Sequence, residues 1–314
     1  MTFMPIVASV RHSLVAESHR DWPEAVWQAA GALGLMFLGS SMLLRSRRHL
    51  RGTTLLAPAI WAAGSLLAIG GTELGLLSTS GGAASDWAEP LRFAAAMSLF
   101  CPTMAVLGAK RPQDKAWQFI VVSLWIVLAL PSGEWLLQSG GEAFEIHPAR
   151  SWFLAILIAI GTVNVLATRF WPSGLLLFVG QLVLLGGYLP LVPRQLPEAI
   201  ATLVGLGLCI IALALVIVGW PARAAVTLPL DRVWLDFRDM FGAVWGLRIV
   251  ERLNASARVG GWDVQLRWNG FCKPSGEPVG QLAPDQAAQI EDASRTLLRR
   301  FVSPEWIAAR LDHP

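Results

Sequence analysis

Charged residues are scarce in this sequence. Of its 314 residues only 15% are charged, whereas 54% are hydrophobic. Soluble globular domains carry about a quarter charged residues, so this composition excludes an ordinary soluble protein and predicts a membrane protein. The net charge of +3 is small, and the basic residues form no clustered stripe of the kind that binds nucleic acid. We therefore expect the lipid bilayer, and no nucleic acid, as a partner of this chain.

Cysteine and histidine are also few, and neither occurs in a pattern that indicates a metal or a cofactor. The three cysteines, Cys101, Cys209 and Cys272, form no CxxC pair, so neither a disulfide framework nor a zinc site is expected. All five histidines lie outside the apolar segments, whereas membrane-bound b-type haem commonly uses histidines within them. The sequence has no HExxH, GxSxG, GxGxxG or GxxxxGK(S/T) motif. We expect no metal and no cofactor, and no motif names a reaction.

What the chain has in abundance is long apolar runs. Seven segments reach the roughly 20 apolar residues that a membrane-spanning helix needs. These segments are residues 25–44, 55–77, 90–109, 117–137, 151–168, 173–192 and 198–219. The fold class predicted is an all-α polytopic bundle over residues 25–222. Residues 1–24 hold only a short apolar patch with charges, so we expect a retained extracytoplasmic segment and no cleaved signal peptide.

The loops between these segments predict the orientation of the chain. Nine basic residues follow the odd-numbered segments: Arg45, Arg47, Arg48, Arg51, Lys110, Arg111, Lys115, Arg169 and Arg223. Only Arg150 and Arg194 occupy the alternate loops. Because positive loops stay in the cytoplasm, we expect the N-terminus outside and the C-terminus inside a cell membrane, the inner or plasma membrane.

Three charged residues interrupt the apolar segments at a similar expected depth. Glu73, Arg92 and Glu134 all fall in the outer part of their segments. A charge costs about 2.5–3.5 kcal/mol at the membrane centre and less toward its surface. The shared depth predicts mutual neutralisation, with Arg92 between the two carboxylates, and makes these residues a candidate polar site.

Helix-disrupting residues cluster near the same depth. Pro131, Ser132 and Gly133 precede Glu134, two glycines precede Glu73, and Gly186, Gly187 and Pro190 lie in the sixth segment. Freed backbone groups are tolerated in lipid only against protein or a wet cavity, so the outer halves of the second, fourth and sixth helices are predicted to line an outward-facing vestibule. The alternative is structural: the carboxylates reach the headgroups, and Gly71 and Gly75 serve close helix packing.

Residues 223–314 differ in character and predict a small α+β cytoplasmic domain. Its 12 Lys/Arg balance 11 Asp/Glu. Residues 230–254 have helical periodicity, with aromatic side chains on one face. That face is the candidate partner-docking surface, formed by Trp234, Phe237, Phe241 and Trp245. The helix is expected either to lie along the membrane surface or, as we favour, to pack as a core helix of the domain.

The remainder of the tail predicts a hairpin and two helices. Residues 262–268 alternate as a strand, Asn269 and Gly270 suit a tight turn, and the prolines after it limit the returning strand. Pro284 is expected to open one helix, and Ser303 to cap a short terminal one with Pro304 at its first position.

These features leave several functions open. The hypothesis that we favour is an accessory or assembly protein whose tail docks a protein partner in the cytoplasm. A second is a transporter or outward-facing solute-binding protein that uses Glu73, Arg92 and Glu134 on an unidentified small molecule. A third is a seven-helix sensor, which rests on topology only. A membrane enzyme would need a nucleophile near these carboxylates, and the sequence shows none.

Overall fold

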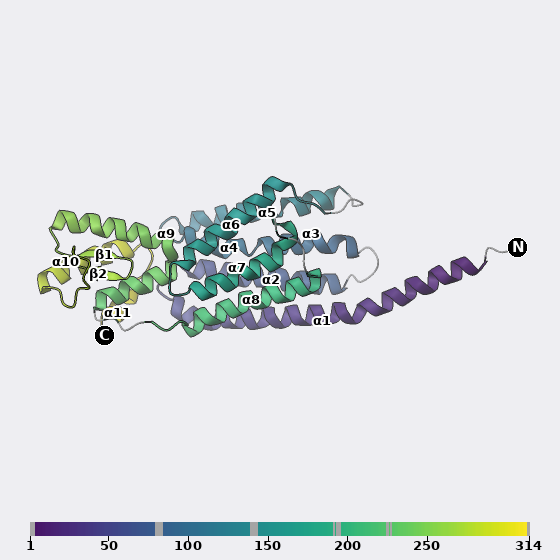
Figure 1. Ribbon diagram of the computed structural model, residues 1–314, viewed down its shortest axis with the longest axis horizontal. Helices are drawn as coiled ribbons and strands as arrows, with labels where there is room; N and C mark the ends of the chain where they lie inside the picture. The colour runs from purple at the N-terminus through teal and green to yellow at the C-terminus, as the bar shows by residue number, and fades with distance from the viewer. Residues whose placement is uncertain are drawn as a thin grey trace.

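The computed structural model describes residues 4–78, 84–138, 144–190, 192, 196–223, 226 and 228–312. Seven helical stretches in it are long and apolar enough to cross a membrane, and they correspond to the seven predicted segments. They are Val26–Leu50, Leu56–Ser78, Trp87–Leu107, Lys115–Leu137, Pro148–Leu166, Trp171–Tyr188 and Ile200–Val218. The chain is thus a multi-pass helical bundle by length and composition, and its two ends lie at opposite ends of the long axis (Figure 1).

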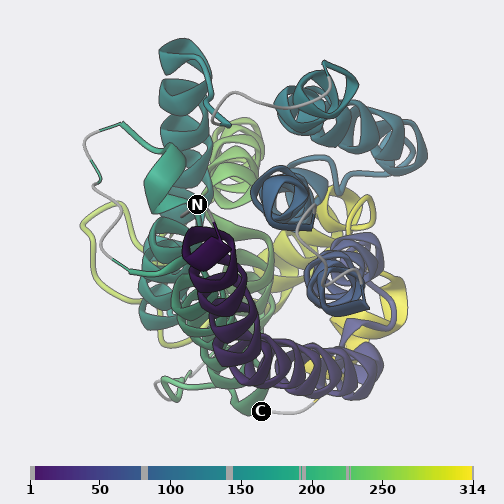
Figure 2. The ribbon, with the colours of Figure 1, turned by 90° about the vertical axis from the view of Figure 1, so that its right-hand side faces the viewer.

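Within the described residues, the bundle consists of eight α-helices and one 3₁₀ turn. They are α1 (Met4–Leu50), α2 (Leu56–Ser78), α3 (Ala84–Met97), α4 (Phe100–Leu107), α5 (Asp114–Leu137), α6 (Pro148–Leu166), α7 (Trp171–Leu185), η1 (Gly186–Tyr188) and α8 (Glu198–Val218). Helix α1 extends well beyond the others at its N-terminal end (Figures 1 and 2). We call that end of the bundle the far end, and the opposite end, where residues 228–312 pack, the tail end.

Small residues let two helices of the bundle approach closely. α1 packs against α2 and α8, and α7 packs against α8. At the α7–α8 crossing, a Cβ atom on Gly180 would lie 2.9 Å from the carbonyl oxygen of Gly205. Any larger residue there would force the helices apart. Association of apolar helices in lipid depends on such backbone proximity, because no hydrophobic gain drives it.

Of the three spans with predicted disruption, only the sixth is broken, because α2 and α5 are continuous helices. A further break occurs in the third span. The third span divides into α3 and α4 around Ser98, because Pro102 has no N–H to donate to the Ser98 carbonyl. The Ser65 hydroxyl of α2 donates to that carbonyl instead, at 2.7 Å. The sixth span ends in the 3₁₀ turn η1 at its glycine pair. Helix α5, in contrast, continues through Pro131 to Leu137.

The tail unit, which we define as residues 228–312, begins with a bent helix. α9 (Pro229–Gly260) has two arms that meet at Gly242, whose φ of 79° only glycine adopts readily. A side chain at Gly242 would also collide with Asn164 at the end of α6. The side-chain Oδ1 of Asn164 accepts a hydrogen bond from the Val244 N–H at 2.9 Å. The bend, which helical periodicity did not predict, therefore fits α9 against the tail end of α6.

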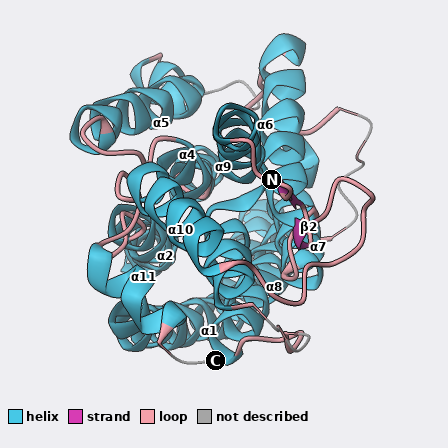
Figure 3. Ribbon diagram, turned by 90° about the vertical axis from the view of Figure 1, so that its left-hand side faces the viewer, coloured by secondary structure: helices cyan, strands magenta, loops and turns pink. Residues whose placement is uncertain are grey.

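A short hairpin and two helices complete the tail unit (Figure 3). β1 (Gln265–Arg267) pairs antiparallel with β2 (Gly270–Cys272), with Leu266 opposite Phe271. The strands are shorter than predicted, and the turn falls one residue earlier, at Trp268 and Asn269. α10 (Pro284–Leu298) and α11 (Pro304–Leu311) begin at the predicted prolines. The Ser303 hydroxyl accepts the Trp306 N–H at 3.3 Å, which confirms the predicted cap.

The aromatic face of α9 is the core of the tail unit and not a surface. Trp234, Phe237, Phe241 and Trp245 are between 0% and 9% exposed. Their rings pack on one another and on Phe301, and the same core includes Leu55 and Ala109 from loops of the bundle. The predicted partner-docking surface is therefore wrong, because α10, α11 and the bundle itself cover that face. The expectation that this helix packs as a core helix agrees with these contacts.

Candidate functional site

Two polar clusters stand out, one at each end of the bundle. At the far end, Arg92 of α3 binds Glu73 of α2 through two parallel hydrogen bonds. Its Nε donates to Glu73 Oε1 at 2.7 Å and its Nη2 to Oε2 at 2.9 Å. Gln28 of α1 also donates to Oε2, at 3.0 Å. The Glu73 side chain is only 3% exposed. Two-point pairing of this kind is the strongest geometry for arginine and a carboxylate.

Glu134 does not join this pair, contrary to the sequence-based expectation. It lies near Arg150 in the first turn of α6, with 3.2 Å between its Oε2 and Nη1, and both side chains are almost half exposed. The reason is helical geometry. Ser132 of α5 faces α3 and donates to the Pro90 carbonyl at 2.7 Å. Two residues further along a helix is about 200° around it, so Glu134 points away from α3.

Among the residues that the structure describes at the far end, the space beside Glu73 and Arg92 is a small cavity and not an open vestibule. It measures about 30 Å³, which holds a water molecule but little more. Glu73 and Arg92 line it together with Thr72, Tyr188 and Thr202. It lies between α2, α3, α7 with η1, and α8, so the fourth span does not contribute. Arg194, in a loop that the sequence places at this end, lies outside the described residues.

Sequence reasoning missed two polar side chains of this cluster. Gln28 bonds to Glu73, and Glu89 accepts a hydrogen bond from the Tyr188 hydroxyl at 3.1 Å. Both residues lie near the ends of their predicted spans, where polar residues are ordinary. For Glu89 a signal existed, because it precedes Arg92 by three residues and so shares its helical face.

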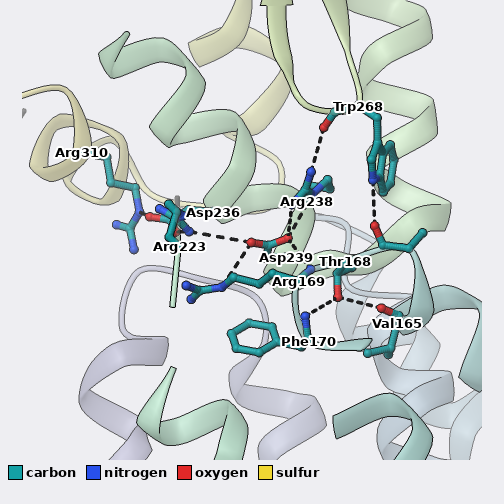
Figure 4. A network of polar contacts seen from close by, with 11 residues as sticks. Val165, Thr168, Arg169, Phe170, Arg223, Asp236, Arg238, Asp239, Trp268 and Arg310 are labelled. Atoms are coloured by element: carbon teal, nitrogen blue, oxygen red, sulfur yellow. Dashed lines mark hydrogen bonds and ion pairs between the residues drawn. The ribbon is translucent and has the colours of Figure 1, made fainter. Parts of the chain in front are cut away.

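At the tail end, six charged residues form the junction network of Figure 4. Its members are Arg169, Arg223, Asp236, Arg238, Asp239 and Arg310. They come from the α6–α7 loop, the chain after α8, helix α9 and helix α11. The sequence marked Arg169 and Arg223 only as indicators of topology, and their shared partners arise solely from the fold.

Asp239 is the centre of the junction network. Its side chain is 2% exposed. Oδ1 accepts hydrogen bonds from Arg238 Nη2 at 2.7 Å and from the backbone N–H of Arg169 at 3.3 Å. Oδ2 lies 3.3 Å from Arg169 Nε and 3.8 Å from Arg223 Nη2. One buried carboxylate therefore holds three guanidinium groups from separate parts of the chain.

Asp236 makes the second set of links. It accepts hydrogen bonds from Arg223 and, at 2.7 Å, from Arg310 Nε. Burial alone would raise the pKa of Asp236, but the hydrogen bonds and charges of Arg223 and Arg310 outweigh it and lower that pKa. Asp236 therefore stays ionised at neutral pH and fastens the chain after α8 to the last helix of the tail unit.

Backbone hydrogen bonds fasten the tail unit to two further loops of the bundle. The Thr54 N–H donates to the Phe301 carbonyl at 2.9 Å, and the Ser303 N–H donates to the Gly52 carbonyl at 2.6 Å. The Arg111 N–H donates to the Arg300 carbonyl at 2.8 Å. All three loops at the tail end thus bind the tail unit, since the α6–α7 loop does so through Asp239.

A basic patch lies beside these junctions and consists of Lys110, Arg248, Arg252 and Arg300. The three arginines are exposed and Lys110 is half-buried. Trp245 contacts both the bundle and the patch. Its Nε1 donates to the Val106 carbonyl at 3.0 Å, and the Arg248 guanidinium carbon lies over its ring, 5.6 Å from the ring centroid. Partial burial, and after it the like charges of Arg300, Arg252 and Arg248, lower the pKa of Lys110.

The stability of the tail unit should depend on the protonation of Asp231. Burial raises the pKa of Asp231 to about 6, although the Phe271 N–H, which it accepts at 2.6 Å, opposes the rise. Because the folded state holds this proton more tightly than the unfolded chain, the contribution to stability is greatest in acid and declines as the pH rises from about 4 through 6. Asp231→Asn keeps the acceptor oxygen but does not titrate. Its free energy of unfolding, relative to that of the wild type, should therefore be up to about 3 kcal/mol higher at pH 7.5 than at pH 4.

Thermal unfolding in detergent between pH 4 and pH 8 measures this difference. Asp263→Asn, at an exposed position of the same unit, is the matched control and should follow the wild type. A constant difference between Asp231→Asn and the wild type across this range would contradict the assignment.

Among the described residues, no group of three His, Cys, Asp or Glu side chains could hold a metal ion. The far-end cluster can hold a small polar species. The junction network can hold the tail unit against the bundle, and the basic patch beside it can attract anions. No protein-family model matches this sequence, and no characterised protein or solved structure is significantly similar to it.

Proposed function

We propose that this chain is an assembly or accessory protein of a cell membrane, which holds its tail unit rigidly at the cytoplasmic face and presents the basic patch to an acidic protein partner. The tail end is taken as cytoplasmic because the nine basic loop residues all lie there, as the positive-inside rule requires. The single observation that supports this function most is the fusion of the tail unit to all three tail-end loops.

That fusion suits a platform better than a transporter. The shared core and the junction network cover the tail end of the bundle, and the far-end cavity has only about 30 Å³. A surface fixed in this way loses little conformational freedom when a partner binds, which favours affinity. Complementary charge then steers the encounter and selects the partner. On the second arm of α9, Glu251 is the only carboxylate, so the patch is strongly biased toward anions.

Site-specific photocrosslinking in intact membranes tests this proposal. A photoreactive residue replaces Leu247, which is 60% exposed beside the patch, or Val259, which is 92% exposed at the distant end of α9. We expect one stoichiometric adduct from position 247 and none from position 259. Arg248→Glu with Arg252→Glu should reduce the adduct at least tenfold. Arg258→Glu with Arg267→Glu, an equal charge reversal at exposed sites, should leave it unchanged.

Three results would overturn the proposal. One is an adduct of equal yield from positions 247 and 259. Another is an adduct that both pairs of charge reversals leave unaltered. The third is crosslinking of position 247 to phospholipid alone, which would assign the patch to the membrane surface and not to a protein.

A second candidate function has a specific observation in its favour. The Glu73–Arg92 pair lies on a cavity inside apolar helices, and ionisable groups in such places mark binding sites for ions or solutes by default. An outward-facing solute-binding protein would use this pair, with the solute carboxylate or cation replacing one partner. Binding to purified protein that is abolished by Arg92→Lys, while the fold is retained, would support this function over the first.

A further inference from the structure

A groove runs along the outside of the bundle between α1 and α2, at the tail end. Its volume is about 370 Å³, within the range of about 300–1,000 Å³ that small-molecule sites occupy. Ala59 and Ala63, one turn apart on α2, leave its floor low. Leu44, Ile60 and Leu67 stand at its sides, with 70%, 63% and 57% of their surfaces exposed. The walls are thus apolar and face the lipid.

The length of the groove matches one leaflet of a bilayer. On α2 it extends from Leu56 to Leu67, and eleven residues of helix rise roughly 16 Å. The hydrocarbon core of a bilayer is about 30 Å thick, so the groove covers about half of it. An acyl chain that lies parallel to the helices, and belongs to the leaflet at the tail end, has these dimensions.

The tail-side mouth of the groove carries a positive charge. Arg47 lines it, in the last turn of α1, and its side chain is exposed. Within the described part of the chain, no carboxylate forms an ion pair with Arg47. Its guanidinium has the fork of donors that pairs with phosphate oxygens. A ligand complementary to the whole groove is apolar along its length and anionic at one end.

We propose that the α1–α2 groove is a binding site for one anionic phospholipid of the tail-side leaflet. One acyl chain lies over Ala59 and Ala63, and the phosphate binds Arg47. This assignment does not depend on the proposed platform function. Basic pockets between membrane helices on the cytoplasmic side bind anionic headgroups in this manner. A partner helix or a second copy of the chain would have to place its own carboxylate at Arg47, whereas the phospholipid brings its charge to that depth.

Native mass spectrometry of the intact protein, titrated with phosphatidylglycerol or with phosphatidylcholine of the same chains, tests the site. We expect one saturable phosphatidylglycerol per protomer and no saturable phosphatidylcholine. Arg47→Gln should weaken phosphatidylglycerol binding about fivefold, because one basic residue near the membrane contributes that much. Ala63→Phe, which fills the floor of the groove, should weaken it to a similar degree.

Two matched controls make the result decisive. Arg45→Gln removes a charge from the same basic run at a position that does not line the groove, and Val127→Phe adds the same ring to an exposed position of α5. Neither should alter binding. Equal losses of phosphatidylglycerol binding in Arg47→Gln and Arg45→Gln would overturn the proposal. Equal binding of phosphatidylglycerol and phosphatidylcholine by the wild type would also overturn it. A change of oligomeric state in Ala63→Phe, without a change in lipid binding, would assign the groove to a second copy and overturn it as well.

Discussion

Replacing Asp239 with asparagine should lower the free energy of unfolding by about 3–5 kcal/mol, which is the usual cost of removing one partner from a buried ion pair. The carboxylate is 2% exposed and holds Arg169, Arg223 and Arg238. Asparagine fills the same space but removes the carboxylate that Arg169 and Arg238 share, whereas Arg223 keeps Asp236, and it offers donors where acceptors are needed. We expect the tail unit to separate from the bundle before the bundle itself unfolds.

Two measurements check this expectation. The melting temperature in detergent should fall, and limited proteolysis should cut the chain between α8 and α9 at a temperature where the wild type resists. Glu291→Gln is the control, because its i,i+4 pair with Arg295 is more than one-third exposed and contributes at most about 0.5 kcal/mol. Adding Arg169→Gln to Asp239→Asn should recover part of the loss, since one uncompensated charge is removed. Additive losses in that double variant would contradict the network.

Replacing Glu73 with glutamine should be comparably costly, about 3–5 kcal/mol, for a related reason. Arg92 would keep its charge among apolar helices, and glutamine offers one neutral acceptor oxygen in place of the two carboxylate oxygens that accept its hydrogen bonds at 2.7 and 2.9 Å. The exchanged pair, Glu73→Arg with Arg92→Glu, should recover much of the loss because it restores the opposite charges at the same place. Thermal unfolding in detergent measures all three proteins.

Glu134→Gln provides the control for this experiment and also tests the site predicted from the sequence. Its partner Arg150 is 42% exposed, so the change should cost less than about 1 kcal/mol. If Glu134→Gln destabilised the protein as much as Glu73→Gln, the result would support the predicted site of Glu73, Arg92 and Glu134. It would contradict the exposed pairing of Glu134 with Arg150.

Variants of the junction network and variants of the Glu73–Arg92 pair also separate the candidate functions. A platform needs the junction network intact and tolerates Glu73→Gln wherever the fold survives. A solute-binding protein needs the far-end pair itself, so Arg92→Lys, which keeps the charge but loses the two-point geometry, should abolish binding. Photocrosslinking at position 247 and solute binding at the far end can therefore be scored on the same set of proteins.

Local features of the fold were predictable where a short stretch of sequence contains the cause. Pro284, Ser303 and Pro304 begin their helices because backbone geometry and capping act within one turn. The glycine pair at 186 and 187 breaks the sixth span for the same reason. Features with a distant cause were not predictable. Gly242 bends α9 to fit Asn164, a residue 78 positions earlier in the chain.

The candidate site shows the same division. The pairing of Glu73 with Arg92 followed from their shared depth, since two opposite charges in lipid lower each other's cost. The direction of Glu134 did not, because it depends on which face of α5 meets α3. The aromatic face of α9 was correctly identified as apolar, yet nothing in the sequence distinguishes a face that binds a partner from one that binds the rest of the chain.

The seven apolar helices, their positions in the chain and the end at which the positive loops gather follow from the amino-acid sequence alone, because length and hydrophobicity act on each segment independently. Which charges meet depends on the three-dimensional packing: Asp239 with three arginines, Glu73 with Arg92, and Glu134 with Arg150. The packing also created the α1–α2 groove and buried the aromatic face of α9. Pairing and burial depend on how helices are rotated and placed against one another, and residues far apart in the chain jointly set that placement.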